Sequence, residues 1–420
     1  MKVAIVCQPS DQLLPPYQTP AAQWSYQVAG RLTLDADVTI FGRKSPTQTA
    51  SIVIEDSPFA QGKLRFRFIH SLPAFVWTLL HTVWMLFSAE THPLAASRLY
   101  HLPYSLHIAR EIRREAYDIV HIHNLAQFVS VIRFFNPQIQ IVLHTHDATL
   151  TKHSRRRTQI HIDKCDRLFT ANDVITKQIH KRFPQTKHYC QTQFHGVDVN
   201  LFRPIAPSER TNDTYIVYVG AAHADEAFAT LVDAFSRLAR LYVHAKFEIL
   251  VRLPCTEQQF VRMKEGVSAE IRDRFNFVNG ISSQDLAAHL QNATVVVSNS
   301  RQTAFNIPLA EAGACGIPCV AVQSHGSNII LEDKRSGFLV QAGDPVALAT
   351  RISDLLLHAN FRRQMGAAAR KRVTQLFAWK KISRSVLHSY RAMLQVEQHN
   401  ALTVQSSDDE AGNHNIEVAQ

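Results

Sequence analysis

One glutamate, Glu311, stands where a strand, a loop and a helix are predicted to follow one another. Residues 294–298 (TVVVS) predict a buried strand, residues 299–306 predict a polar loop, and Pro308 suits the first turn of a helix. Such a helix N-terminus binds anions, because its first amides lack partners and its dipole end is positive. A carboxylate in that first turn could accept hydrogen bonds from two vicinal hydroxyls of a ribose beside a bound pyrophosphate. The alternative is a carboxylate that the helix dipole alone favours there.

Four histidines alternate along two apolar segments, at His121, His123, His144 and His146. Alternate residues of a strand share one face of a sheet, and an imidazole can bind a metal or hydrogen-bond a substrate. No carboxylate or cysteine completes a metal-ligand set at a typical spacing. We therefore expect no metal at these histidines.

Short apolar strands alternate with amphipathic helices along the chain, which is typical of doubly wound α/β domains. A polar linker that contains Pro204 and Pro207 separates two such halves. Ligands of this architecture bind outside the carboxyl ends of the strands. The predicted strands cover residues 3–6, 38–41, 119–122, 141–144 and 168–170 in the first half, and residues 215–219, 246–251, 275–278, 294–297 and 319–322 in the second.

The composition suits two ordinary cores, with 420 residues of which 46% are hydrophobic. A net charge of +10 fits an acidic partner such as a nucleotide diphosphate, an anionic membrane or a nucleic acid, although scattered cations are as often only solvated. No nucleic-acid-binding motif supports the last option. The six cysteines show neither disulfide nor zinc spacing, and no signal peptide precedes the first strand, so we expect reduced thiols and a cytoplasmic protein.

One segment, residues 72–87 (LPAFVWTLLHTVWMLF), has membrane character. It is shorter than the roughly 20 apolar residues that a spanning helix needs. A buried helix is the favoured interpretation, and the alternative is an interfacial helix anchored by Trp77 and Trp84. In that case the protein would lie peripherally on the inner face of the membrane, and nearby cations would face anionic lipid: Lys63, Arg65, Arg67, Arg110, Arg113 and Arg114.

The segment around Glu311 resembles the donor site of the retaining glycosyltransferases of the GT-B fold, family 4 in the usual sugar-transferase classification. There the segment reads Glu, Gly, Phe, Gly, four further residues and Glu, and a small-residue helix follows that ends in Gly-x-Pro. Four positions match: Phe305, Glu311, Gly316 and Pro318. Three depart: Thr303 replaces the first glutamate, and Ala304 and Asn306 replace the glycines.

Further segments resemble the same family in the same order, so that the resemblance spans about residues 1–395. No single segment is specific, but their order and distances are. They are residues 118–124 (DIVHIHN), 141–147 (IVLHTHD), 196–204 (GVDVNLFRP), 336–345 (SGFLVQAGDP) and 377–379 (FAW).

The resemblance implies a GT-B fold, with two Rossmann-like doubly wound domains that face each other across a cleft and a C-terminal helix that crosses back to the first domain. The implied parts are an acceptor-side domain at 1–200, a linker at 201–213, a nucleotide-sugar-binding domain at 214–378, a crossover helix at 379–396 and a tail at 397–420. The polar composition of the tail predicts disorder.

The resemblance also implies a site that uses a nucleotide sugar as co-substrate and no metal. Glu311 would bind the ribose, and His146 would be the catalytic residue that hydrogen-bonds the transferred sugar. His121, His123 and Asn124 would line the acceptor side of the cleft. The other donor-binding residues would be Thr303, Phe305, Asn306, Ile307, Gly220, Arg252 and Arg301.

The sequence departs most from the family at the diphosphate. The family pattern Gly-Arg-x-x-x-x-Lys-Gly aligns with residues 220–227, which keep Gly220 but put Ala221 and Glu226 where the two cations should be. A glycine-rich loop of the family aligns with residues 17–23, which contain no glycine. Arg252 or Arg301 could supply the missing charge from another direction, or each is an ordinary surface arginine.

Two functions of different class follow. The favoured one is a hexosyltransferase (EC 2.4 class) that moves a hexose from a nucleotide sugar to a glycan or lipid-linked acceptor with retention. The alternative is a catalytically degenerate GT-B protein that serves as a binding or scaffold partner in polysaccharide or cell-envelope glycan synthesis. Glu311 and the histidines favour the first function, whereas the lost cations and Thr303 favour the second.

Overall fold

The structure of this chain is a computed structural model that divides into two compact units. Unit 1 comprises Met1–Leu13, Ala21–Gln193 and the chain from Ser383, and unit 2 comprises Leu14–Pro20 and Phe194–Ile382. The predicted linker at 201–213 thus lies within unit 2. The described residues are 1–14, 18–44, 51–54, 64–69, 101–152, 154–211, 213–221, 225–252, 254–301 and 304–395.

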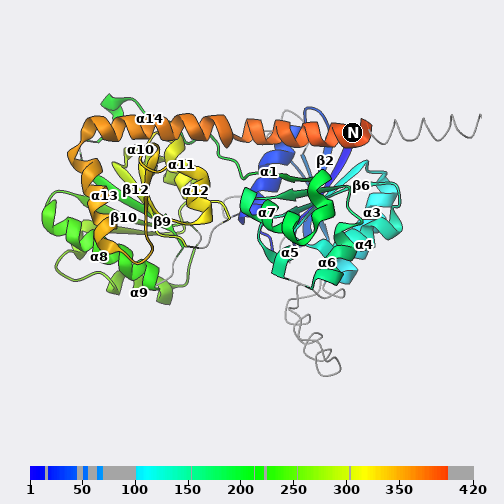
Figure 1. Ribbon diagram of the computed structural model, residues 1–420, viewed down its shortest axis with the longest axis horizontal. Helices are drawn as coiled ribbons and strands as arrows, with labels where there is room; N and C mark the ends of the chain where they lie inside the picture. The colour runs from blue at the N-terminus through cyan, green and yellow to red at the C-terminus, as the bar shows by residue number, and fades with distance from the viewer. Residues whose placement is uncertain are drawn as a thin grey trace, which may run out of the picture. The chain divides into compact units, whose positions relative to one another are not determined.

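Unit 1 is built on a sheet of the order β3-β4-β2-β1-β5-β6-β7-β8, of which Figure 1 labels β2 and β6. Neighbouring strands are parallel, except that β3 runs antiparallel to β4. The strands are β1 (Lys2–Val6), β2 (Asp37–Arg43), β3 (Ser51–Ile54), β4 (Leu64–Ile69), β5 (Ile119–His123), β6 (Gln140–Thr145), β7 (Arg167–Thr170) and β8 (Cys190–Thr192). The helices are α1 (Pro20–Leu32), α3 (Leu102–Glu115), α4 (Ala126–Phe135), α5 (Thr149–Lys152), α6 (Arg155–Ile162), α7 (Asp173–Arg182) and the 3₁₀ turn η2 (Pro184–His188).

Unit 2 is built on a parallel sheet of the order β11-β10-β9-β12-β13-β14. Its strands are β9 (Tyr215–Gly220), β10 (Lys246–Val251), β11 (Phe275–Asn279), β12 (Val295–Ser298), β13 (Cys319–Val322) and β14 (Gly337–Val340). Its helices are α8 (Glu226–Leu241), α9 (Glu257–Glu265), α10 (Ser283–Asn292), α11 (Ile307–Ala314), α12 (His325–Ile330), α13 (Pro345–Leu357) and α14 (Ala359–Leu376), with 3₁₀ turns η3 (Pro207–Glu209) and η4 (Arg272–Arg274).

Each sheet has one topological switch point. The strands that come first in the sequence extend the sheet in one direction from this point, and the later strands extend it in the other direction. In unit 1 this point lies between β1 and β5, and in unit 2 it lies between β9 and β12. Open α/β sheets bind ligands outside the carboxyl ends of the strands at such a switch point. The fold therefore directs attention to the residues after His123 in unit 1, and to those after Gly220 and Ser298 in unit 2.

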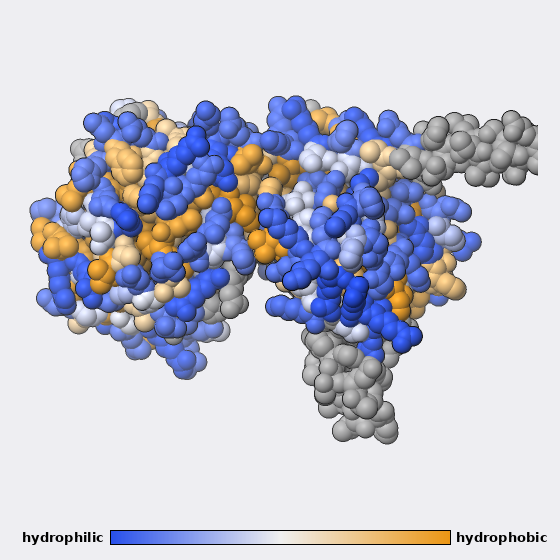
Figure 2. All heavy atoms as spheres, viewed as in Figure 1, coloured by the Kyte–Doolittle hydropathy of each residue, from blue (hydrophilic) through white to orange (hydrophobic). Residues whose placement is uncertain are grey.

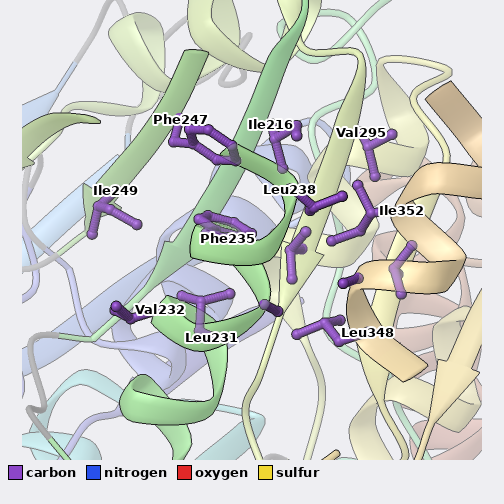
Figure 3. Packing of buried hydrophobic residues seen from close by; sticks show 14 of the residues in the cluster. Ile216, Leu231, Val232, Phe235, Leu238, Phe247, Ile249, Val295, Leu348 and Ile352 are labelled. Carbon is purple, nitrogen blue, oxygen red and sulfur yellow. The ribbon is translucent and has the colours of Figure 1, made fainter. Parts of the chain in front are cut away.

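The core of unit 2 shows why these sequences form these elements. Phe228, Leu231, Phe235 and Leu238 recur along α8 at helical spacing, and all are buried. They pack on inward residues of β9 and β10 and on Leu348 and Ile352 of α13 (Figure 3). The strands are apolar on both faces because helices cover both sides of a parallel sheet.

All ten predicted strands are confirmed by the structure. β3, β4, β8 and β14 were not predicted, although the alternating sequence LRFRFI of β4 carries a period-two signal. Residues 379–395 are helical, and from Ser383 onward this helix belongs to unit 1. Segment 72–87 and the tail at 397–420 lie outside the described residues.

No helix in the described part of the chain combines the length and the apolar character that crossing a bilayer requires. The six cysteines are free thiols. Three cations expected to face lipid are instead paired with carboxylates: Arg65 lies 3.0 Å from Asp37, and Arg67 and Arg114 both pair with Glu111 and Glu115.

Candidate active site

A buried ion pair joins two of the predicted donor-binding residues. Glu311 lies on α11 with only 2% of its side chain exposed, and its Oε2 accepts a hydrogen bond from Arg252 Nη1 at 2.5 Å. Arg252 directly follows β10, and its Nη2 donates to the Ser283 hydroxyl at 3.2 Å. The carboxyl edge of the unit 2 sheet thus brings a carboxylate and a guanidinium together. The interpretation of Arg252 as an ordinary surface arginine is wrong.

The position of Glu311 corrects one detail of the prediction. α11 begins at Ile307, so Glu311 lies in the second turn, and the first turn holds no acidic residue. The helix dipole alone therefore does not explain this carboxylate. Burial raises the pKa of Glu311, and the charge and hydrogen bond of Arg252 oppose that rise.

Asn306 is the N-cap of α11 rather than a substitute for a flexible glycine. Its Oδ1 accepts a hydrogen bond from the amide of Leu309, which satisfies one of the unpaired donors of the first turn. Its Nδ2 donates to Ser298 Oγ at 2.8 Å and lies 3.4 Å from Ser327 Oγ. Asn306 is 2% exposed, so its side chain fixes the start of α11 against β12 and α12 and leaves only its backbone for a ligand.

Three neighbouring residues were also predicted to bind the donor: Phe305, Ile307 and Thr303. The Phe305 ring is buried against Phe377 and His195, so it could serve a ligand only through its backbone. Ile307 is partly buried at the first position of α11. Thr303 lies outside the described residues.

The N-terminus of α8, where the family pattern would place its cations, carries two carboxylates. Asp225 caps the helix and accepts a hydrogen bond from the amide of Phe228 at 2.9 Å, and Glu226 follows it. Gly220 ends β9, and a Cβ there would lie 2.1 Å from the Tyr218 hydroxyl, so a larger residue would require the Tyr218 side chain to move. An anion placed at this helix end would meet negative charge.

Arg301 belongs to the α8 end of the site. Its Nη1 lies 3.4 Å from Glu226 Oε2, and the two side chains are 38% and 80% exposed. An exposed pair of this kind contributes little to stability, so a ligand could exchange partners with either side chain at small cost.

The four histidines form one cluster in unit 1 at the carboxyl ends of β5 and β6. His121, His123 and His144 are completely buried, and His123 is paired with His144 in the sheet register. Trp24 of α1 covers the cluster, with its ring centroid 4.7 to 6.3 Å from the four imidazole centroids. The prediction that His121 and His123 line a cleft is wrong, because neither side chain is accessible.

Burial keeps His121, His123 and His146 neutral. It lowers the pKa of His146 to about 3, and burial with the neighbouring imidazoles lowers the pKa of His121 and His123 well below the ordinary value. A neutral imidazole offers one donor and one acceptor nitrogen. The cluster can therefore hydrogen-bond a substrate but carries no charge to offer it.

His146 is the member nearest to solvent, and its neighbours fix its position. Its amide donates to Asn124 Oδ1 at 2.7 Å, and its Nε2 lies 2.7 Å from His123 Nδ1. Asn124 adopts a left-handed backbone with φ of 59°, which asparagine tolerates better than most residues. Asn124 thus holds His146 at the switch point of the sheet, as a positioning residue.

The structure also shows two residues that the sequence analysis missed. Trp24 covers the histidines, and the Tyr390 hydroxyl lies 2.6 Å from His121 Nδ1. Trp24 lies 97 positions before His121, and Tyr390 lies 269 positions after it, and no local pattern encodes contacts over such distances.

A metal interpretation of the cluster is poorly supported. Among the described residues, His121, His123 and His144 offer ring nitrogens within 4.8 Å of one another. Both nitrogens of His123 already make hydrogen bonds, to Ser25 and to His146.

The His121 to Tyr390 contact gives a testable coupling. His121→Phe leaves the Tyr390 hydroxyl buried without its partner, and we expect the free energy of unfolding of unit 1 to fall by about 1 to 3 kcal/mol. Tyr390→Phe should cost a similar amount. The double variant should recover most of the loss, because both ends of the bond become apolar. Urea denaturation of all three variants measures the coupling.

Tyr104→Phe is the matched control, because Tyr104 is equally buried in unit 1 but its hydroxyl donates to the Cys7 carbonyl. Its effect should add to that of His121→Phe. Additivity in the His121 and Tyr390 double variant would contradict the coupling.

Comparison with known proteins gives this geometry a family context. Residues 204–372 match the model of the family described as glycosyl transferases group 1. Spore coat protein SA of Bacillus subtilis is 22% identical over 306 residues, which are 67% of this chain and 80% of that protein.

Solved structures agree in fold over both units. Sucrose-phosphate synthase from Thermosynechococcus elongatus aligns with a TM-score of 0.74 at 20% identity, over 94% of this chain and 99% of that one. Anabaena Alr3699/HepE in complex with UDP-glucose aligns with a TM-score of 0.65 at 14% identity, over 93% and 100%. Residues 204–372 are therefore similar to the glycosyl transferases group 1 family, and the chain has a two-domain α/β architecture with parallel sheets that matches the GT-B fold of these solved structures.

Proposed function

We propose that the protein moves a hexose from a nucleotide sugar to a glycan or lipid-linked acceptor, with retention of configuration, as a family 4 enzyme of polysaccharide synthesis. The observation that carries the proposal is the buried Glu311 paired with Arg252 at the carboxyl edge of the unit 2 sheet. A carboxylate for ribose hydroxyls and a cation for phosphate are the two groups that a nucleotide diphosphate requires. The UDP-glucose bound to the related Anabaena fold supports a donor of this class.

In the proposed complex the ribose hydroxyls take the place of Arg252 on Glu311. The released guanidinium turns to the diphosphate, where Arg301 is the second available cation. The amides at the start of α11 contribute from the backbone of Asn306 and Ile307. Phe305, Gly220 and Thr303 complete the donor side, the first two through backbone.

The reaction breaks the bond between the anomeric carbon and the phosphate oxygen and forms a bond from that carbon to the acceptor hydroxyl oxygen. The acceptor proton passes to the departing phosphate, which guides attack from the same face. His146 holds the transferred sugar. No metal is needed when cations and a helix N-terminus stabilise the leaving diphosphate.

A second candidate is a binding or scaffold protein that no longer turns over. The observation that favours it is the α8 N-terminus, which carries the carboxylates of Asp225 and Glu226, with Glu226 at the position of one of the family cations. This site would bind a nucleotide weakly, because like charge opposes the phosphates.

We also propose that the protein contacts the cytoplasmic face of an anionic membrane, where it would reach a lipid-linked acceptor. Arg65 and Arg67 are paired with carboxylates and do not supply it. The visible surface over α5 and α6 is strongly hydrophilic (Figure 2), and Lys152, Arg155 and Arg156 are exposed there. These cations are better placed to meet anionic lipid.

Calorimetry with UDP, GDP and ADP sugars tests the proposed donor site. We expect one of the three to bind, and Glu311→Gln to weaken it at least tenfold, because the lost hydrogen bonds to a charged group contribute about 1.5 to 3 kcal/mol. Glu332→Gln is the matched control, since Glu332 lies in unit 2 but pairs with Arg335 and Arg372.

Product analysis separates the two candidates. Donor binding with turnover supports the transferase, and donor binding without turnover, over a broad acceptor panel, supports the scaffold. Failure of all three donor classes to bind the wild-type protein would contradict the donor site itself.

A further inference from the structure

A chain of side-chain hydrogen bonds runs from the core of unit 1 to His146. Ser25 Oγ lies 2.9 Å from the Ala21 carbonyl oxygen, 3.3 Å from Cys7 Sγ and 3.0 Å from His123 Nε2. His123 Nδ1 in turn lies 2.7 Å from His146 Nε2. Every group in this chain is neutral, because burial raises the pKa of the Cys7 thiol and lowers those of the two imidazoles. Each of these groups therefore has a known number of protons, and the donor and acceptor of each hydrogen bond can be assigned.

The count starts at Ser25, whose hydroxyl has one proton to donate and two lone pairs to accept with. Within α1 the Ala21 carbonyl lies four residues back and can only accept, so it takes the Ser25 proton, as serines in helices commonly arrange. Ser25 Oγ is then an acceptor for its other two neighbours. The Cys7 thiol donates to one lone pair, and His123 must donate to the other.

The remaining protons follow from this assignment. His123 carries its single proton on Nε2, so its Nδ1 is an acceptor. His146 Nε2 must therefore be the donor in the 2.7 Å contact. His146, being neutral, then has its lone pair on Nδ1, and none of the described residues bonds that atom.

We propose that Ser25 and His123 are positioning residues that hold His146 as the Nε2–H tautomer, so that its Nδ1 accepts a hydrogen bond from a hydroxyl of the bound sugar. The identity of the ligand rests on the proposed function, whereas the assignment of the His146 tautomer does not. A substrate hydroxyl is both donor and acceptor, whereas an ether or carbonyl oxygen is only an acceptor. The site thus selects a free hydroxyl on the sugar at this position over an etherified or oxidised one.

The opposite proton order satisfies fewer groups. If Ser25 donated to His123 Nε2, then His123 would donate to His146, and the Ala21 carbonyl would lose the hydroxyl. Three hydrogen bonds would replace four. One net hydrogen bond favours the first order by roughly three- to tenfold.

The tautomers can be measured without any ligand. In the full-length protein with ¹⁵N-labelled histidine at pH 7.5, long-range ¹⁵N–¹H correlation distinguishes a protonated ring nitrogen from one with a lone pair. We expect His123 and His146 both to be protonated at Nε2, with assignment by loss of signals in His146→Gln and His123→Gln. Protonation of His146 at Nδ1 would overturn the proposal.

Ser25 variants test the positioning role. Ser25→Ala removes the acceptor for His123 Nε2–H, and the Nε2–H preference of His146 should fall from roughly tenfold towards one. Ser25→Thr keeps the hydroxyl and should restore it. An unchanged His146 tautomer in Ser25→Ala would overturn the role of Ser25. If that variant does not fold, the wild-type spectrum still shows which nitrogen of each histidine carries the proton. Loss of donor binding with the Nε2–H tautomer intact would contradict the proposed function alone.

Discussion

Acidification from pH 7.5 to pH 5 should remove about 6 kcal/mol that three buried histidines contribute to the stability of unit 1, because they must stay neutral while it is folded. His121, His123 and His146 all have pKa values lowered by burial. In the unfolded chain each regains a pKa near 6.5 and binds a proton below it, which contributes about 2 kcal/mol per histidine at pH 5. The stability is therefore present above pH 6.5 and lost as pH falls towards the folded pKa values. This loss is comparable to the whole stability of a domain, about 5 to 15 kcal/mol.

Hydrogen exchange resolves the effect by unit. Amides of β5 and β6 should lose protection steeply between pH 7 and pH 5, after correction for the intrinsic exchange rate. Amides of β9 in unit 2 serve as the internal control. In unit 2 the pKa of His289 is raised, mainly by its hydrogen bond to Glu248. The His289 and Glu248 pair therefore stabilises unit 2 below pH 6.5, and this stabilisation is lost as the pH rises.

The variant His121→Phe with Tyr390→Phe sharpens the test. It removes one of the three titrating imidazoles and leaves no buried hydroxyl unpaired. The loss of stability between pH 7.5 and pH 5 should become smaller by about 2 kcal/mol. A flat profile for unit 1 between pH 7.5 and pH 5 would contradict the neutral cluster.

The sequence predicted the strands well because burial on both faces of a parallel sheet leaves long apolar runs. It also placed α11 correctly, since Pro308 and the small residues before Gly316 are local signals of where a helix begins and ends. The short edge strand β8 gave no such signal, because its three residues are only partly buried.

The chemistry of the site was less predictable than its location. Arg252 and Glu311 lie 59 positions apart, and their contact depends on where β10 and α11 meet at the sheet edge. Periodicity reports that a side chain is buried, but not which partner it meets. Asn306 was interpreted as a lost glycine of a ligand loop, whereas the structure shows a helix cap, a role that the Asn306, Ile307, Pro308 sequence already permitted.

Arg252→Met should destabilise unit 2 by about 3 to 5 kcal/mol, because it leaves the Glu311 carboxylate buried without its partner. Adding Glu311→Gln should recover most of that loss, since the remaining amide carries no charge. Burial already raises the pKa of Glu311, and removal of Arg252 should raise it further. The single variant should therefore regain stability as pH falls and the carboxyl becomes protonated. Urea denaturation followed by a unit 2 probe, at pH 7.5 and pH 5.5, measures both effects.

Arg301→Met is the matched control, because it removes an arginine from the same site whose pair with Glu226 is exposed. It should change the free energy of unfolding by about 0.5 kcal/mol or less. The same variants also separate stability from binding. The Arg252→Met and Glu311→Gln double variant should recover most of the lost stability and yet fail to bind a nucleotide sugar, because it lacks both the ribose carboxylate and the nearer phosphate cation. A double variant that folds and still binds the donor with wild-type affinity would show that the buried pair is structural and that the nucleotide is held elsewhere in the protein.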